Sequence, residues 1–338
     1  MARVKGIVVM EGADGTGKTT LAQHLCRLTD GYYMHLTYVD DIYKYQTDKL
    51  VEAVRRSNDQ LVVIDRHWIS EQIYARVYRN GSVMAHSARG MDRVLRKYGT
   101  VYCLCVPNNV KAVVDQYTKL QQVRTEMYKD GMDKVAQAYL NLFHEVPTMV
   151  LPARDYYERL CEGQWNKRND VIRYRIFRNN MDITAGAILD RVQKLRSEQP
   201  DLLLDPDVPN FTGHVSAKYL IVGNRTGALS SSSQPKHWPF FHNSGAAKFL
   251  YQAFHLSRLD ESEFAWTNAT GYDSDRILPM IKKYGWRVIC LGERASQTVS
   301  RYTDDWTFVM HPNSAIFHNL SSAVYANKLV SAVRNHNE

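Results

Sequence analysis

The segment Gly12–Thr19 (Gly-Ala-Asp-Gly-Thr-Gly-Lys-Thr), directly behind the apolar run Ile7–Met10, constrains this chain more than any other feature. Glycines in such a loop permit positive φ angles and leave room for backbone N–H groups to wrap phosphates. The helical run Thr20–Cys26 supplies the strand-loop-helix context that a phosphate-binding loop requires. We therefore predict that Lys18 spans the β- and γ-phosphates and that Thr19 holds Mg²⁺. A glycine-rich turn that matches by accident is the alternative.

Strand-like and helix-like periods alternate through residues 1–198, which predicts an α/β fold with a mainly parallel sheet flanked by helices on both faces. The predicted strands are Val4–Glu11, Tyr32–Thr37, Leu61–Asp65, Thr100–Val106 and Val171–Phe177. The predicted helices include Asp48–Arg56, Ile69–Tyr78, Met132–Phe143 and Thr184–Leu195. Such a fold is the expected frame for a phosphate-binding loop.

The length of 338 residues exceeds the usual size of one domain, so we expect two. Residues 1–198 form the first, and the proline-rich and acidic stretch 199–214 is the best candidate for a linker. Residues 215–338 form the second, which is also α/β. It contains apolar runs at 219–223 and 287–292, and it closes with a helix over Ser321–Val333.

The net charge of +8 predicts an attractive field for phosphate-rich partners, either nucleotides or a nucleic acid. No run is long enough for a signal-peptide core or a membrane span, so we expect a soluble, cytoplasmic protein with no membrane partner. Five cysteines without a paired framework suit a reducing compartment. Cys103 and Cys105 share one face of a predicted strand, and we interpret them as core residues.

An acid and an arginine, Asp65 and Arg66, end the buried run Leu61–Ile64, where open α/β sheets bind ligands. Asp65 could organise Mg²⁺ or act as a base toward an acceptor oxygen, and Arg66 could make paired hydrogen bonds to a phosphoryl group. Ser70 and Tyr74 follow one turn apart and would line the same side of the next helix. A structural ion pair is the alternative for Asp65 and Arg66.

These motifs resemble those of the thymidylate kinase family. Glu11–Thr20 is similar to its phosphate loop and Asp65–Ser70 to its Asp-Arg motif, a likeness that covers roughly the N-terminal 200 residues. The resemblance implies that Asp14 contacts the deoxyribose or its neighbourhood and that Arg66 holds the acceptor-side phosphate. The nucleotide-binding residues are then Gly12, Ala13, Asp14, Gly15, Thr16, Gly17, Lys18, Thr19 and Thr20, with ATP as donor.

The same resemblance places Lys119–Glu126 in a mobile lid, with Arg124 available to stabilise charge on the transferring group. The proline and arginine spacing that the family usually keeps around its lid is not clearly kept in this sequence. A charged helix of this kind is also commonly a solvated face. The expected catalytic residues are Lys18, Asp65, Arg66 and Arg124, with Thr19 and Asp65 at the metal.

The second domain carries five short motifs that are similar in order and spacing to the uracil-DNA glycosylase superfamily. They are Leu220–Gly227, Pro239-Phe240, Thr267-Asn268, Leu291–Ala295 and His311-Pro312. The resemblance implies that Phe240 stacks on an extruded base, that Asn268 binds its polar edge and that His311 lies over the sugar or the base oxygen. Asn224 stands where many relatives carry an acid. Because an amide cannot serve as a base near neutral pH, we expect base recognition rather than base removal.

Positive charge alternates with aromatic residues in Lys167–Arg178, a composition that suits a nucleic-acid backbone and stacked bases. Arg173 and Arg175 share one face of the predicted strand there. A solvated strand face is the alternative. The candidate contacts to a nucleic acid or base are therefore Asp14, Ser70, Tyr74, Arg173, Arg175, Phe240, Asn268 and His311.

The resemblance extends to the 5-hydroxymethyluridine DNA kinase branch of the family, known from viral thymine hypermodification. A base accepts phosphate only if it bears an alcohol, so the expected activity is ATP-dependent phosphorylation of 5-hydroxymethyluracil in DNA. A kinase for free thymidylate or another deoxynucleoside monophosphate is the first alternative. A DNA-binding or glycosylase-like protein with regulatory nucleotide binding is the second, and a DNA-coupled ATPase is the third.

Overall fold

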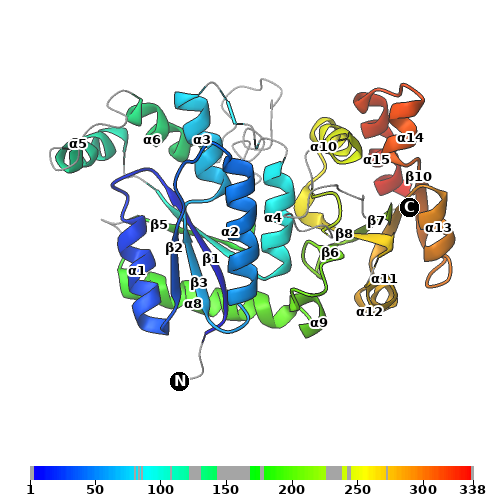
Figure 1. The fold of residues 1–338 in the computed structure, drawn as a ribbon, viewed down its shortest axis with the longest axis horizontal. Helices are drawn as coiled ribbons and strands as arrows, with labels where there is room; N and C mark the ends of the chain where they lie inside the picture. The colour runs from blue at the N-terminus through cyan, green and yellow to red at the C-terminus, as the bar shows by residue number, and fades with distance from the viewer. Residues whose placement is uncertain are drawn as a thin grey trace. The chain divides into compact units, whose positions relative to one another are not determined.

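The computed structural model describes residues 4–79, 81–82, 84, 87–106, 109–121, 131–142, 168–175, 179–225, 238–241, 245–271 and 273–335. The chain divides into two compact units. One comprises Met1–Ala88 and Gly99–Ser197, and the other comprises Arg89–Tyr98 and Glu198–Glu338. Each unit contains its own sheet, with helices on both sides of it (Figure 1).

The first unit is built on a five-stranded sheet in the order β2-β3-β1-β4-β5. Its strands are β1 (Gly6–Gly12), β2 (Tyr32–His35), β3 (Leu61–Asp65), β4 (Val101–Cys105) and β5 (Val171–Tyr174). All the strand pairs are parallel, and Val8 in β1 lies between Val63 in β3 and Val101 in β4. A parallel sheet places the carboxyl ends of β1 and β3 at one edge, beside the predicted phosphate loop. The prediction of a parallel α/β sheet is confirmed.

Helices cover both faces of this sheet, which is why its central strands are continuous apolar runs. The helices in the described part of the first unit are α1 (Lys18–Thr29), α2 (Ile42–Arg56), α3 (Trp68–Tyr78), α5 (Val110–Gln121), α6 (Met132–Asn141) and α8 (Met181–Glu198). Val8 and Met10 face a cluster with Leu21 of α1 and Ile188 of α8, while α2 and α3 contact the sheet through β3 and β1. Cys103 and Cys105 lie in the core, as expected.

Helix α2 begins at Ile42, earlier than the predicted start at Asp48. The side chain of Asp41 caps it by accepting a hydrogen bond from the backbone N–H of Lys44, which satisfies one of the free donors of the first turn. Strand β2 is shorter than predicted and ends at His35. The start of α2 therefore depends on this local cap as well as on packing against β3.

The second unit is built on another five-stranded sheet, in the order β10-β9-β7-β8-β6. Its strands are β6 (Phe211–Thr212), β7 (Tyr219–Arg225), β8 (Phe264–Thr270), β9 (Arg287–Leu291) and β10 (Trp306–Val309). Only the short β6 is antiparallel to its neighbour in this sheet. Its helices include α4 (Ser87–Lys97), α9 (Asp201–Leu204), α10 (Gly245–Ser257), α11 (Ser274–Ile277), α12 (Met280–Tyr284), α13 (Glu293–Val299), α14 (Pro312–Phe317) and α15 (Ser322–Asn335).

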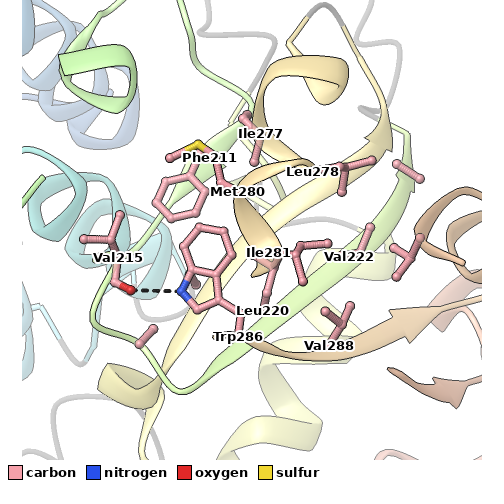
Figure 2. Packing of buried hydrophobic residues seen from close by; sticks show 14 of the residues in the cluster. Phe211, Val215, Leu220, Val222, Ile277, Leu278, Met280, Ile281, Trp286 and Val288 are labelled. Atoms are coloured by element: carbon pink, nitrogen blue, oxygen red, sulfur yellow. Dashed lines mark hydrogen bonds between the residues drawn. The ribbon is translucent and has the colours of Figure 1, made fainter. Parts of the chain in front are cut away.

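Side chains along β7 alternate between two apolar cores, because successive residues of a strand point to opposite faces. Leu220 and Val222 lie in the core on the side of α11, α12 and α13, whereas Tyr219 and Ile221 lie in the core formed with α10 and α15. Figure 2 shows the first of these cores, in which Trp286 donates from its indole N–H to the carbonyl oxygen of Val215 at 2.9 Å.

The segment 199–214, for which prolines and acidic residues predict a linker, is packed into the second unit. It forms α9 and β6, and its apolar side chains Leu203, Val208 and Phe211 lie in the core. The ring of Phe211 stacks on that of Trp286 with centroids 5.6 Å apart. The apolar residues between the prolines supply enough buried surface to order the segment.

Gly12 supports a direct prediction about stability. Its φ is 150°, and a Cβ there would lie 2.3 Å from the carbonyl oxygen of Cys105. We expect Gly12→Ala to lower the free energy of unfolding by about 2–4 kcal/mol, from strain and overpacking together. The matched control is Gly186→Ala on α8, where no atom lies within 4 Å, and helix propensity should raise stability by up to about 1 kcal/mol. Urea unfolding checks both, and equal midpoints for the two variants would contradict the close approach.

Candidate functional site

The predicted phosphate loop joins the carboxyl end of β1, at Gly12, to the first residue of α1, Lys18. Gly15 and Gly17 adopt left-handed backbone conformations, with φ of 77° and 82°. Gly17 is the N-cap residue of α1, and no side chain among the described residues caps this end of the helix. The N–H groups of its first turn are therefore oriented toward the loop, where an anion can accept from them.

Lys18 folds back into this loop. Its ammonium group donates to the carbonyl oxygen of Ala13 at 2.9 Å and lies 3.9 Å from the carboxylate of Asp14. The side chain is buried, and burial together with the charge of Arg66 lowers its pKa. A cation held in this way gains from any anion that enters the loop, because the anion supplies compensating charge.

Thr19 and Asp65, the two predicted metal residues, are in contact. The hydroxyl of Thr19 donates to Oδ2 of Asp65 at 2.8 Å, and the hydroxyl of Tyr33 on β2 donates to the same oxygen at 2.8 Å. Burial acts to raise the pKa of Asp65, but hydrogen bonds from His35 and Thr19 and the charge of Lys18 hold it well below its ordinary value. Asp65 is therefore a carboxylate at neutral pH.

The oxygens of Thr19 and Asp65 fit a magnesium ion. Oδ1 of Asp65 is buried and accepts no hydrogen bond from the described residues, which leaves one carboxylate oxygen with unused capacity. Within the described part of the chain, no group of three or more His, Cys, Asp or Glu side chains forms a metal site. Mg²⁺ needs no such group, because it takes one or two protein oxygens and fills its shell with phosphate and water.

Arg66, Asp14 and Tyr74 form a second cluster beside the loop. Arg66 makes an ion pair with Asp14, and its guanidinium lies over the ring of Tyr74, 4.8 Å from the centroid. The hydroxyl of Tyr74 donates to the other oxygen of Asp14 at 3.1 Å. Burial alone would raise the pKa of Asp14, but Arg66 and Lys18 hold it below the ordinary value. The φ of Arg66 is 72°, a strained conformation that such a site can retain for its geometry.

Glu11 is a functional candidate that the sequence reasoning missed. It is fully buried, and its carboxylate accepts from the backbone N–H of His67 at 2.9 Å and from the hydroxyl of Ser70. The hydroxyl of Ser70 also lies 2.8 Å from the hydroxyl of Tyr139 on α6. The Ser70 side chain is therefore turned toward Glu11 and Tyr139. Burial raises the pKa of Glu11. The sequence signal that could have identified Glu11 is the presence of an acidic residue in the otherwise apolar strand β1.

The helix α5 lies against the phosphate loop, because a Cβ on Gly15 would come within 2.8 Å of the Gln116 side chain. Lys119, near the end of that helix, is exposed. Arg124, the predicted lid arginine, lies outside the described residues. Its catalytic role stays a prediction.

His67 makes the free energy of unfolding depend on pH. Its imidazole is buried, and burial lowers its pKa from 6.5 to about 3. Since the unfolded chain binds a proton below pH 6.5 and the folded chain does not, stability conferred by neutral His67 is present above pH 6.5 and is lost as pH falls toward 3. We expect that the stability difference between wild type and His67→Gln changes by on the order of 1 kcal/mol per pH unit in this window. Urea unfolding from pH 7 to pH 4 tests this, and a constant difference would contradict it.

The second unit brings two of the predicted base-binding residues, Phe240 and Asn268, together. A Cβ on Gly223, at the end of β7, would lie 2.6 Å from Oδ1 of Asn268 and 2.7 Å from the ring of Phe240. Asn268 is buried, and its amide N–H₂ donates to the side chain of Asn210 at 3.1 Å. An aromatic ring and an amide oxygen thus both lie against one glycine.

His311 and Asn224 converge on a second glycine. A Cβ on Gly292 would lie 3.0 Å from Cβ of His311 and 3.1 Å from Oδ1 of Asn224. The Nδ1 of His311 accepts from the backbone N–H of Asn313 at 3.2 Å, and burial lowers the pKa of the imidazole. His311 is therefore neutral at physiological pH, with Nε2 as the protonated nitrogen.

Arg173 lies in β5, an edge strand of the first sheet, whereas Arg175 follows Tyr174, the last residue of that strand, so only Arg173 of the two is in the strand. Arg173 is exposed and Arg175 is partly exposed. The backbone N–H of Arg175 donates to the side chain of Asn179. Their contact with a nucleic acid stays a prediction.

No protein-family model matches the sequence, and no curated protein is similar to it. Solved structures do match. One is the YorR protein of Bacillus subtilis in complex with phosphorylated GDP, at 17% identity over 57% of this chain and 99% of that chain, with a TM-score of 0.38. Another is a gluconokinase from Sinorhizobium meliloti 1021, at 12% identity over 58% and 95%, with a TM-score of 0.28. At these values, neither neighbour assigns a function to this chain.

None of the described helices combines the length with the apolar character that a bilayer span demands.

Proposed function

We propose that the first unit is a phosphotransferase that uses a nucleoside triphosphate as donor, with ATP as the expected one. The observation that carries this proposal is the contact between Thr19 and Asp65 beside an uncapped helix N-terminus that also presents Lys18. A glycine-rich turn that matched by accident would have no reason to place a buried carboxylate from β3 on the threonine of its helix. The pairing is what a phosphate and metal site needs.

The chemistry is transfer of the γ-phosphoryl group to an alcohol. The acceptor oxygen bonds to the γ-phosphorus, the bond from that phosphorus to the bridging oxygen breaks, and the nucleoside diphosphate leaves with that oxygen. Lys18 and the loop N–H groups hold the phosphates, and Arg66 stabilises charge on the equatorial oxygens. Mg²⁺, when bound by Thr19 and Asp65, neutralises phosphate charge. Because its pKa is low, Asp65 stays a carboxylate and orients the acceptor hydroxyl, and the proton that this hydroxyl loses passes to solvent water.

For the acceptor, we propose 5-hydroxymethyluracil in DNA. Thymine itself has no alcohol, whereas the hydroxymethyl group provides the oxygen nucleophile that phosphate transfer requires. The convergence of Phe240 and Asn268 on Gly223 supports recognition of a base by the second unit, and the net charge of +8 suits a nucleic-acid partner. Asn224 has no basic group, so this unit would bind the base without cleaving it.

A free deoxynucleoside monophosphate is the second candidate acceptor. The cluster of Arg66, Asp14 and Tyr74 favours it, because a guanidinium beside an aromatic ring can hold the phosphate and sugar of a monomer. This cluster lies within the first unit and would need nothing from the second. A glycosylase-like protein in which nucleotide binding is regulatory remains the alternative from another class.

The test incubates the protein with γ-labelled ATP, Mg²⁺ and DNA that carries either thymine or 5-hydroxymethyluracil. We expect label only on the hydroxymethylated DNA, and digestion should locate it on the modified nucleotide. Parallel reactions contain free thymidylate and free 5-hydroxymethyl-deoxyuridylate. Transfer to the monomers alone would contradict the DNA acceptor, and ATP hydrolysis without any transfer would contradict the phosphotransferase itself.

A further inference from the structure

The helix α4 carries an arginine whose contacts among the described residues lie in the second unit, although α4 precedes β4 of the first unit in sequence. Arg93 is fully buried. Its Nη2 donates to the carbonyl oxygen of Phe240 at 3.0 Å and to the hydroxyl of Tyr251 on α10 at 2.9 Å. The Tyr251 hydroxyl in turn donates to the same carbonyl of Phe240. Two donors from two helices therefore bind one backbone oxygen.

That oxygen belongs to a strained residue. Phe240 has a φ of 50°, which costs a bulky side chain energy and persists only where the surroundings enforce it. The guanidinium of Arg93 also lies over the ring of Trp266, 4.5 Å from its centroid, and the Trp266 ring meets the ring of Phe240 edge to face at 5.7 Å. Arg93 therefore acts on Phe240 in two ways. It binds the backbone carbonyl oxygen of Phe240 directly, and it packs on the Trp266 ring that contacts the Phe240 ring.

Burial of a guanidinium is costly unless its surroundings compensate the charge. The partners of Arg93 among the described residues are carbonyl oxygens, a hydroxyl and aromatic faces. Because Arg93 has no exposed surface, it cannot contact a nucleic-acid phosphate itself, which is the usual role of arginine in such proteins. Its contacts act on the conformation of residues 239–240.

We propose that Arg93 is a positioning residue that fixes Phe240 as the stacking platform for a planar pyrimidine base. This inference rests on the base recognition that we propose for the second unit. Without Arg93, the carbonyl of Phe240 loses a charged donor, and the backbone can relax from its left-handed conformation. The ring of Phe240 would then move away from Gly223 and Asn268, against which it packs in the structure.

The test is a double-mutant cycle on the full chain, with Arg93→Met, Phe240→Ala and the double variant. Fluorescence anisotropy measures binding to a labelled single-stranded oligonucleotide that carries one 5-hydroxymethyluracil, and to the same oligonucleotide with an abasic site there. The readout is the ratio of the two dissociation constants, because a general loss of structure would weaken both. We expect the wild type to prefer the base by roughly tenfold, the size of one stacking contact.

We expect each single variant to lose most of that preference, and the double variant to lose no more than Phe240→Ala, because Arg93 acts through Phe240. Tyr251→Phe keeps the buried charge and removes one donor, so it should lose about half of the preference on a logarithmic scale even if Arg93→Met does not fold. ATP affinity, measured by calorimetry, should be unchanged in all of these variants.

The outcomes separate the two proposals. A wild type that binds the base and the abasic site equally would contradict base recognition, and the positioning role would fall with it. A wild type that prefers the base, with Phe240→Ala impaired and both Arg93→Met and Tyr251→Phe unimpaired, would overturn the role of Arg93 alone. Additive losses in the double variant would also overturn it, because they would mean that Arg93 and Phe240 act independently.

Discussion

Replacing Lys18 by methionine will lower the rate of phosphate transfer by roughly 10²- to 10³-fold, the usual effect of removing one fixed charge from a transition state. Methionine keeps most of the buried length of the side chain and removes the ammonium group. Burial lowers the pKa of Lys18, which means that the buried ammonium charge destabilises the folded state when no anion is bound. Removing this charge should therefore not lower the free energy of unfolding. Single-turnover transfer from labelled ATP measures the rate.

The matched control is Lys194→Met, on the exposed surface of α8. This variant removes the same charge at a distance from the loop and should transfer phosphate at the wild-type rate. Thermal unfolding of both variants shows that the folds are intact. A Lys18→Met protein that keeps more than about a tenth of the wild-type rate would contradict the electrostatic role of this residue.

Replacing Asp65 by asparagine will lower transfer by about 10²-fold and raise the Mg²⁺ concentration that gives half of the maximal rate by about tenfold. The amide keeps the shape of the side chain and loses the charge that fits the metal. It can also accept only through its single oxygen, so Thr19 and Tyr33, which both donate to Oδ2 of Asp65, lose a charged acceptor. A Mg²⁺ titration of the transfer rate makes the measurement.

Asp65→Asn should also change how stability depends on pH. The pKa of Asp65 is held below its ordinary value, so the stability that it confers is present above that value and is lost as pH falls through the folded-state pKa. The asparagine variant lacks this loss. Asp190→Asn, at an exposed position of α8, is the control for both readouts. An unchanged Mg²⁺ requirement in Asp65→Asn would contradict the metal site.

The parallel sheet of the first unit was predictable because its central strands β1, β3 and β4 are buried on both faces. Runs such as Leu61–Asp65 are then continuously apolar, and the predicted bounds of this strand match those of β3. Helix ends were less predictable. The start of α2 depends on the Asp41 cap and on packing against β3, and neither is encoded in the apolar period alone.

The glycine-rich loop between β1 and α1 was predictable from residue spacing, since all of its parts are consecutive. The contacts between side chains that are far apart in sequence were not predictable. The sequence suggested separate roles for Asp14, Arg66 and Tyr74, but only the fold shows that they bind one another. It suggested Ser70 as a base contact, whereas the fold turns this hydroxyl toward Glu11. Pairs that are far apart in sequence depend on strand order, which a single sequence does not specify.

The place of α4 was the least predictable feature. Its sequence lies between two elements of the first unit, and its arginines and Lys97 are typical of a solvated helix face. In the structure they are buried. Arg93, Arg96 and Lys97 donate to backbone carbonyl oxygens, as Lys97 does to Val208 at 2.6 Å, and Arg89 pairs with the carboxylate of Glu261. The sequence of such a helix does not indicate that a distant segment buries it, because charged residues are usually exposed.

The most direct test of the central claim is calorimetric titration of the full chain with a non-hydrolysable ATP analogue in the presence of Mg²⁺. We predict binding of one analogue per chain, with affinity lost in Lys18→Met and retained in Lys194→Met. Absence of binding to the wild type at millimolar analogue, with the protein folded by circular dichroism, would contradict the assignment of residues 12–19 as a triphosphate site.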